Sequence, residues 1–198
     1  DSGAELSISE FKVEQGQVTV NKGTLSVGVM ALESGAAISF GESSSMVAEE
    51  VSLESGVMSI SGGYLSVQTI VLESNSVLSI DLNSSVSINE ITLGPDSTIV
   101  FDGGEVVWEK FDASSGGEFS WNGGKFSCHF VSGSIVASGN AIFNPGHSPG
   151  ETLIDGDLII SSDEARFPME IWGLTKDLYD RAEISGLFSV SGILEIIV

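Results

Sequence analysis

The sequence predicts an all-β protein, a right-handed parallel β-helix (β-solenoid) whose rungs of about 20 residues each contain three strands. The first observation is a repeat at spacings of 20, 20, 20, 21 and 20 residues, at Val20, Phe40, Ile60, Ile80, Phe101 and Trp121. The second is the period-two alternation of apolar residues within each repeat, which indicates strands. The third is a turn of Gly, Asn, Asp or Ser after each strand. A period in this range is typical of stacked solenoids.

Each repeat contains three apolar pairs, and each pair predicts one strand with one buried face. The first pairs are Val18/Val20, Ile38/Phe40, Met58/Ile60, Leu78/Ile80, Ile99/Phe101 and Phe119/Trp121. The second pairs are Leu25/Val27, Met46/Ala48, Leu65/Val67, Val86/Ile88, Val106/Trp108 and Phe126/Cys128. The third pairs are Met30/Leu32, Val51/Leu53, Ile70/Leu72, Ile91/Leu93 and a weaker Phe111/Ala113. Equivalent strands should therefore stack about 4.8 Å apart.

The turns after the first strands should form the corners of the coil. Residues 21, 61, 81, 102 and 122 are Asn, Ser, Asp, Asp and Asn, and several precede a Gly-Gly pair. Positive φ costs Gly little and is tolerated by Asn or Asp, so we expect the Gly-Gly, Asn and Asp positions to take the corners. The crossover preference of parallel strands predicts the right-handed coil.

We expect one domain, with regular rungs over residues 1–134 and irregular rungs of the same solenoid over 135–198. The sequence begins inside a rung, because Leu6, Ile8, Phe11 and Val13 match the second and third strands. It also ends on the strand-like run 193–198. Solenoids need covered ends. We therefore expect either a fragment of a longer chain or ends that contact neighbouring molecules, by self-association or through adjacent domains.

The composition limits the partners. Seven Lys and Arg stand against 28 Asp and Glu, a net charge of −21. This argues against nucleic acid, which requires a basic face, and against docking on anionic lipid. No apolar run is long enough to insert into a bilayer. Salt screens such self-repulsion, so an extracellular or saline setting suits the chain. The single cysteine, Cys128, should be a small buried side chain beside Phe126.

The C-terminal sequence resembles a known family. The run 144–158 (NPGHSPGETLIDGDL), followed by Met169-Glu170-Ile171, Tyr179-Asp180-Arg181 and Gly192-Ile193-Leu194-Glu195, resembles the C-terminal part of bacterial autotransporter passenger β-helices and related secreted repeat proteins. Departures are Arg181-Ala182, where the family has x-Leu, and Ser191-Gly192, where Gly-Gly is common. The resemblance covers roughly 140–198 and implies a secreted or surface-displayed protein of adhesin or stalk type. No membrane β-barrel translocator is present, so the autotransporter route itself is not supported.

We expect no enzymatic activity. Polysaccharide lyases and glycosidases on β-helices need clustered carboxylates with a basic residue, whereas the outward positions of the first two strands are mostly Ser, with Thr19 and several Val. Asp102 and Asp112 have the spacing of corner and surface residues. His147 and Ser148 share a loop near Asp155, but the spacing matches no nucleophile elbow. His129 should point into solvent. Thr residues are too scattered for an ice-binding ladder.

The sequence also contains a candidate calcium-binding ladder and a candidate glycosylation site. Glu33, Glu54 and Glu73 occupy one slot in three successive Leu-Glu-Ser turns, so they should form a carboxylate ladder. We expect a solvated acidic edge, with weak, adventitious Ca²⁺ binding as the alternative. Asn83-Ser84-Ser85 is an N-glycosylation sequon on a turn. Trp108 and Trp121 should be core residues, and Trp172 should be exposed.

The sequence therefore predicts a structural or adhesive extracellular β-solenoid segment of a larger surface protein or filament. The alternative is a carbohydrate-binding or polysaccharide-degrading β-helix. Partners would be other copies or neighbouring domains at the solenoid ends, and surface glycans.

Overall fold

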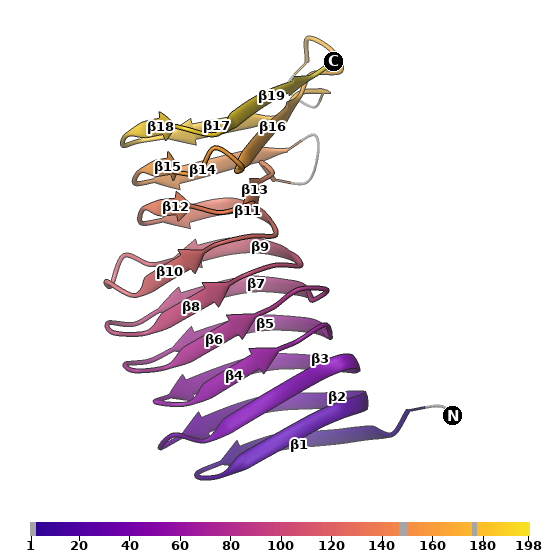
Figure 1. The fold of residues 1–198 in the computed structure, drawn as a ribbon. Coiled ribbons are helices and arrows are strands. Elements are labelled where there is room, and N and C mark those ends of the chain that lie inside the picture. Colours follow the sequence, from indigo (N-terminus) through magenta and orange to yellow (C-terminus); the bar gives the residue numbers. More distant parts are fainter. Residues whose placement is uncertain (1–2, 147–149, 176–177) are drawn as a thin grey trace.

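The computed structural model describes residues 3–146, 150–175 and 178–198 (Figure 1). Within these residues, segments with alternating apolar side chains form strands. The described residues contain strands and no α-helix. The strands are β1 (Glu5–Val13), β2 (Gln17–Glu33), β3 (Ala37–Glu54), β4 (Val57–Ile60), β5 (Tyr64–Leu72), β6 (Val77–Ile80), β7 (Ser85–Leu93), β8 (Thr98–Phe101), β9 (Glu105–Asp112), β10 (Glu118–Trp121), β11 (Lys125–Ser132), β12 (Ile135–Ala137), β13 (Ile142–Phe143), β14 (Glu151–Asp155), β15 (Leu158–Ile160), β16 (Arg166–Glu170), β17 (Arg181–Ile184), β18 (Phe188–Val190) and β19 (Ile193–Ile197).

The strands stack in parallel as a β-solenoid of about eight turns with a spacing of about 20 residues. The predicted register is confirmed at each strand. Ile38 pairs with Met58 in the first ladder, and Met46 pairs with Leu65 in the second. Ile70 pairs with Ile91 in the third. The predicted start inside a rung is confirmed as well, since Leu6 pairs with Leu25.

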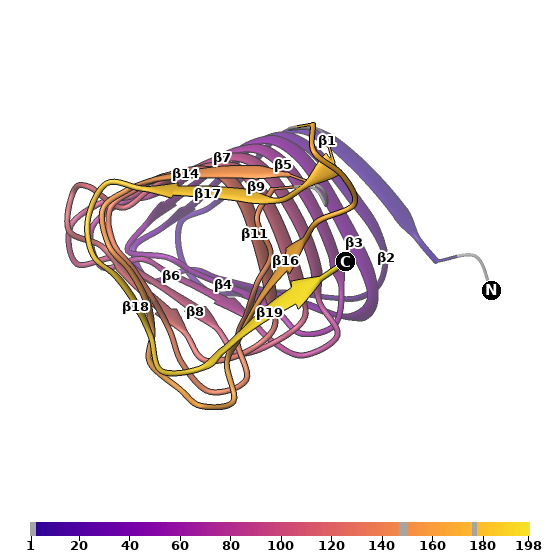
Figure 2. The same ribbon diagram turned by 90° about the horizontal axis from the view of Figure 1, so that it is seen from above.

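The solenoid has three faces, and Figure 2 shows its roughly triangular outline along the axis. Face 1 consists of residues 17–20 and 37–40, followed by β4, β6, β8, β10, β12, β15 and β18. Face 2 consists of the first halves of β1, β5, β7, β9 and β11, the matching parts of β2 and β3, and then β13, β16 and β19. Face 3 consists of the second halves of those longer strands, followed by β14 and β17.

The core changes character along the axis. Up to β7 the inward residues are mainly Leu, Ile, Val and Met, and most of them are fully buried. From Phe101 onward aromatic rings stack from rung to rung. The ring centroids of Phe101 and Trp121 are 6.4 Å apart, and those of Phe143 and Phe167 are 5.2 Å apart. Such aromatic pairs add stabilisation beyond the area that they bury.

The corner after face 1 has positive φ in the Gly-Gly pairs, as expected, at Gly62 (87°), Gly104 (84°) and Gly124 (81°). In the rung of β6, which has no Gly-Gly pair, Asn83 (64°) has the positive φ, and Asp81 does not. A Cβ added at Gly104 would lie 2.4 Å from the carbonyl oxygen of Ser84 in the rung below. Glycine is therefore required there by both its φ and its close packing.

After Ser132 the loops lengthen, but the three ladders continue. On face 1, β12 pairs with β10 and β15, and β15 pairs with β18. On face 3, β14 pairs with β11 and β17. On face 2, β16 pairs with β13 and β19. Among the described residues, no helix is long and apolar enough to cross a membrane.

Candidate functional site

The surface is organised as ladders, because equivalent outward residues of successive rungs lie one above another. Five basic residues each pair with a Glu of an adjacent rung: Lys12, Lys110, Lys125, Arg166 and Arg181. The Lys110 Nζ to Glu90 Oε1 distance is 2.5 Å, and the Lys125 Nζ to Glu105 Oε1 distance is 3.1 Å. Most positive charge is thus neutralised locally, and the excess carboxylates determine the field around the solenoid.

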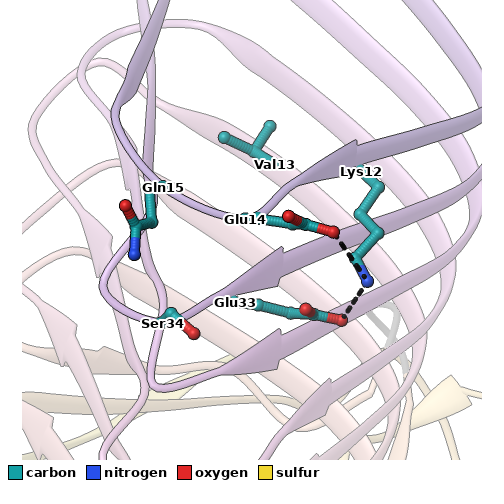
Figure 3. Close-up of a pocket in the computed structure, with 6 residues that line it drawn as sticks. All are labelled: Lys12, Val13, Glu14, Gln15, Glu33 and Ser34. Atoms are coloured by element: carbon teal, nitrogen blue, oxygen red, sulfur yellow. Dashed lines mark ion pairs between the residues drawn. The ribbon is translucent and has the colours of Figure 1, made fainter.

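A shallow cavity of about 720 Å³ lies at the corner of the first two rungs, between faces 3 and 1 (Figure 3). Its lining includes Lys12, Glu14 and Glu33. The Lys12 Nζ lies 3.0 Å from Glu33 Oε1 and 3.4 Å from Glu14 Oε1. The hydrogen bond to Glu33, and then its charge, raise the pKa of the Lys12 ammonium. The ammonium therefore already occupies the position where a cation would meet these carboxylates.

The predicted carboxylate ladder begins in this cavity. Glu33 and Glu54 are paired in register, and the Glu73 amide donates to the carbonyl of Leu53 in the preceding rung. Within the described parts of the chain, no group of three or more His, Cys, Asp or Glu side chains is arranged to hold a metal ion. Adventitious Ca²⁺ binding along this edge stays a prediction.

Hydroxyl groups form ladders on faces 1 and 2. On face 1, Thr19, Ser39 and Ser59 are in register, and the Ser39 hydroxyl donates to Thr19 Oγ1 at 3.3 Å. On face 2, the Thr24 and Ser45 hydroxyl oxygens are 2.8 Å apart. Ser127 is the exception to the predicted exposure of face 2, because it is buried and Asn144 donates to its hydroxyl at 3.5 Å.

The corner beside face 1 carries a further polar ladder. The Ser61 hydroxyl donates to Asp81 Oδ2 at 2.8 Å. The Asn122 amide donates to Asp102 Oδ1 at 2.9 Å, and the Ser138 hydroxyl donates to Asn122 Oδ1 at 3.0 Å. These corner residues therefore connect neighbouring rungs, a role that the turn preferences alone did not indicate.

Asn83 lies in the turn between β6 and β7, where it is exposed. The following residue, Ser84, is buried, and its hydroxyl donates to the Ile60 carbonyl at 2.8 Å. Ser85, the third residue of the sequon, is exposed at the start of β7. The Asn83 side chain is therefore accessible, and glycosylation at this residue stays a prediction.

Cys128 is buried in the core, as predicted, with 1% exposure. Its burial raises the pKa of the thiol to about 12, which leaves it protonated at neutral pH.

His129 points outward as expected, but it is not merely solvated. Its Nδ1 lies 2.5 Å from Glu109 Oε2 in the adjacent rung.

The Ser-His-Asp alternative involves His147, Ser148 and Asp155. His147 and Ser148 lie outside the described residues, whereas Asp155 ends β14 on face 3. Asp155 Oδ1 accepts a hydrogen bond of 2.9 Å from the Ser185 hydroxyl. Asp102 and Asp112 lie at a corner and on the surface as predicted, and Asp112 accepts hydrogen bonds from the Ser114 hydroxyl and amide. Those two bonds lower the pKa of the Asp112 carboxyl.

The tryptophans lie where the alternation predicts. Trp108 and Trp121 are buried, with 0% and 1% exposure, and Trp172 is 58% exposed. Trp121 Nε1 donates to the Gly123 carbonyl at 3.0 Å, whereas the buried Trp108 Nε1 has no hydrogen-bond partner among the described residues.

Asp180 is the residue whose role the sequence did not reveal. Its carboxylate is buried and accepts hydrogen bonds of 2.8 Å from the amides of Gly150 and Glu170. The Asp180 amide donates back to the Glu170 carbonyl at 2.8 Å. One side chain thus joins the start of β14 to the end of β16. Its place in the Tyr179-Asp180-Arg181 run of the resemblance was the one available signal.

No protein-family model, curated protein or solved structure matches the chain.

Proposed function

We propose that this chain is a stiff structural and adhesive segment of an extracellular surface protein or filament. The observation that carries the proposal is the continuous stack of parallel ladders, in which each rung forms backbone hydrogen bonds with the next on three faces. Such a stack behaves as a rod whose repeated outward side chains form long contact surfaces. The acidic surface favours a setting in which salt screens its charge.

The ends of the solenoid support contacts with further rungs or other copies. In the last rung, Phe188, Leu194 and Ile196 are 44%, 50% and 53% exposed, although their ladder positions are inward. At the first rung, Leu6 is 55% exposed for the same reason. Another rung stacked on either end would bury these side chains and gain hydrophobic stabilisation.

Adhesion can be measured with beads that carry the chain through a terminal tag. Coated beads should resist detachment by flow from a second layer of the protein or from a polysaccharide layer more strongly than beads coated with an unrelated acidic protein. Equal detachment on every layer would contradict the adhesive role.

Location and stiffness need separate measurements. Antibodies to the chain should label intact producing cells, and labelling that requires permeabilisation would contradict the surface location. Small-angle scattering should give an elongated particle, and a flexible-chain profile would contradict the rod.

The carbohydrate-binding alternative has one supporting observation, the exposed Trp172 near the C-terminal end. Aromatic faces are common sugar-binding surfaces because they combine apolar area with a polar edge. If this alternative holds, Trp172→Ala will abolish bead retention on polysaccharide and leave retention on the protein layer unchanged.

A further inference from the structure

Face 1 has an unusual charge distribution for so acidic a chain. Its outward positions in five successive rungs are Gln17, Thr19, Ala37, Ser39, Val57, Ser59, Val77, Ser79, Thr98 and Val100. None is charged, although charged residues make up 18% of the chain and concentrate on protein surfaces. Of the two outward ladders, the one that begins at Thr19 continues without charge through Ser120, Val136, Ile159 and Ser189, whereas the one that begins at Gln17 reaches Glu118 in the sixth rung.

The uncharged outward side chains of face 1 in these five rungs, here called the floor, are also small and regularly spaced. Its strands β4, β6 and β8 each contain four residues and pair without a register shift. In Figure 2 they lie together along one side of the outline. Face 2 differs, because Tyr64 projects from it with 46% exposure and Glu105 and Lys125 lie on it. Face 3 carries the Glu90–Lys110 pair.

Acidic residues border the floor on both sides. Along one edge lies the ladder of Glu33 and Glu54, followed by Glu73. Along the other edge lie Asp81 and Asp102 in the corner ladder. The pattern is therefore a neutral strip between two negative rims.

We propose that face 1 is a lateral self-association surface, on which a second copy of this chain packs face to face when salt screens the rims. Anionic partners are excluded by the rims, and the floor contains no aromatic side chain for stacking on a sugar. The same strip on a second copy is equally uncharged, so two copies can meet there without opposing charges across the floor. Small residues let two sheets approach to about 10 Å, as in packed β-sheets.

The area fits a weak, reversible contact. Both outward ladders are uncharged over five rungs, which span about 24 Å at about 4.8 Å each, and their strands are roughly 13 Å wide. The strip therefore covers about 300 Å² on each copy, or about 600 Å² in a pair, the size of a weak, transient contact. The rims of the two copies would face each other, so their repulsion should decide whether the pair forms.

Sedimentation velocity of the whole chain tests this inference. Between about 0.01 M and 1 M NaCl the Debye length falls from about 30 Å to about 3 Å, so dimer formation should increase with salt. Ser59→Glu, at the centre of the floor, should weaken dimerisation at least about tenfold because it places like charges in the interface. Ser66→Glu adds the same charge to face 2 of the same rung and should leave dimerisation unchanged.

An end variant separates this inference from end-to-end stacking. Leu194→Glu changes an exposed residue of the last rung and should leave the lateral dimer intact. Loss of assembly in Leu194→Glu but not in Ser59→Glu would assign the contact to the ends. A wild-type chain that stays monomeric near millimolar concentration in 1 M NaCl, or Ser59→Glu that dimerises like the wild type, would overturn the proposal. Circular dichroism confirms that each variant is folded. These outcomes are independent of the cell-surface test and of bead retention on the polysaccharide layer.

Discussion

The rungs up to Ser132 and the rungs from Ile135 onward share the same ladders but hold their turns differently. In the regular rungs, short turns are fixed by buried hydroxyls that reach a carbonyl one rung away, such as Ser76 to Leu53 at 2.5 Å. The irregular rungs keep this device at Thr152, whose hydroxyl donates to the Cys128 carbonyl at 2.5 Å, but their longer loops are also fixed by Asp180 through two backbone amides. A repeated sequence can reuse one small hydrogen-bonding device, whereas each longer loop needs its own.

A substitution in the aromatic part of the core should produce the largest loss of stability. Trp121→Ala removes a buried ring that contacts Phe101, Phe126 and Phe143, and it should lower the free energy of unfolding by about 3–5 kcal/mol. Ile80→Ala makes a cavity in the aliphatic part of the same face and should cost somewhat less. Denaturant melts measure both variants, and equal losses would show that the larger aromatic ring contributes no more to stability than an aliphatic side chain.

Asp180→Ala should cause the second-largest loss of stability. Two buried amides lose a charged acceptor, so we expect a loss of about 3 kcal/mol. Hydrogen exchange should accelerate in β14, β16 and β17 but stay unchanged in β4 to β7. Asp155→Ala is the control, since Asp155 is exposed and accepts one side-chain hydrogen bond. Uniform acceleration over the whole chain would contradict a local role for Asp180.

Cys128 lies where the two regions join and gives the junction a pH dependence. Burial raises the thiol pKa from 9.0 to about 12, so above pH 9 the unfolded chain loses a proton that the folded chain keeps. Stability should therefore fall as pH rises from 9 to 12, by up to about 1.4 kcal/mol per pH unit from this group. Cys128→Ala should show a shallower slope, and parallel slopes would indicate that the thiol is accessible in the folded chain.

Ser76→Ala should have the smallest effect, about 1–2 kcal/mol, because it removes one of two donors to the Leu53 carbonyl and the acceptor of the Ser55 amide. Ser74→Ala, in the same turn but exposed, should change stability little. Equal free energies of unfolding for the two variants would show that the buried hydroxyls do not fix the regular turns.

The sequence predicted the regular rungs almost completely, because period-two burial determines which residues stack and therefore the register. It predicted the Gly-Gly corners, but it did not predict that Asn83, and not Asp81, takes the positive φ in its rung. It also did not reveal the Glu109–His129 pair or the role of Asp180. Those contacts join residues 20 and 30 positions apart through side chains, and local patterns carry no information about them.

The rung-by-rung stacking has a mechanical consequence. If the two ends are pulled apart along the axis, each rung detaches from its neighbour by breaking its strips of backbone hydrogen bonds in sequence. A folded rung contributes about 4.8 Å of length, whereas its roughly 20 residues extend to about 70 Å. The chain is therefore a store of hidden contour length, released in steps of about 65 Å under load.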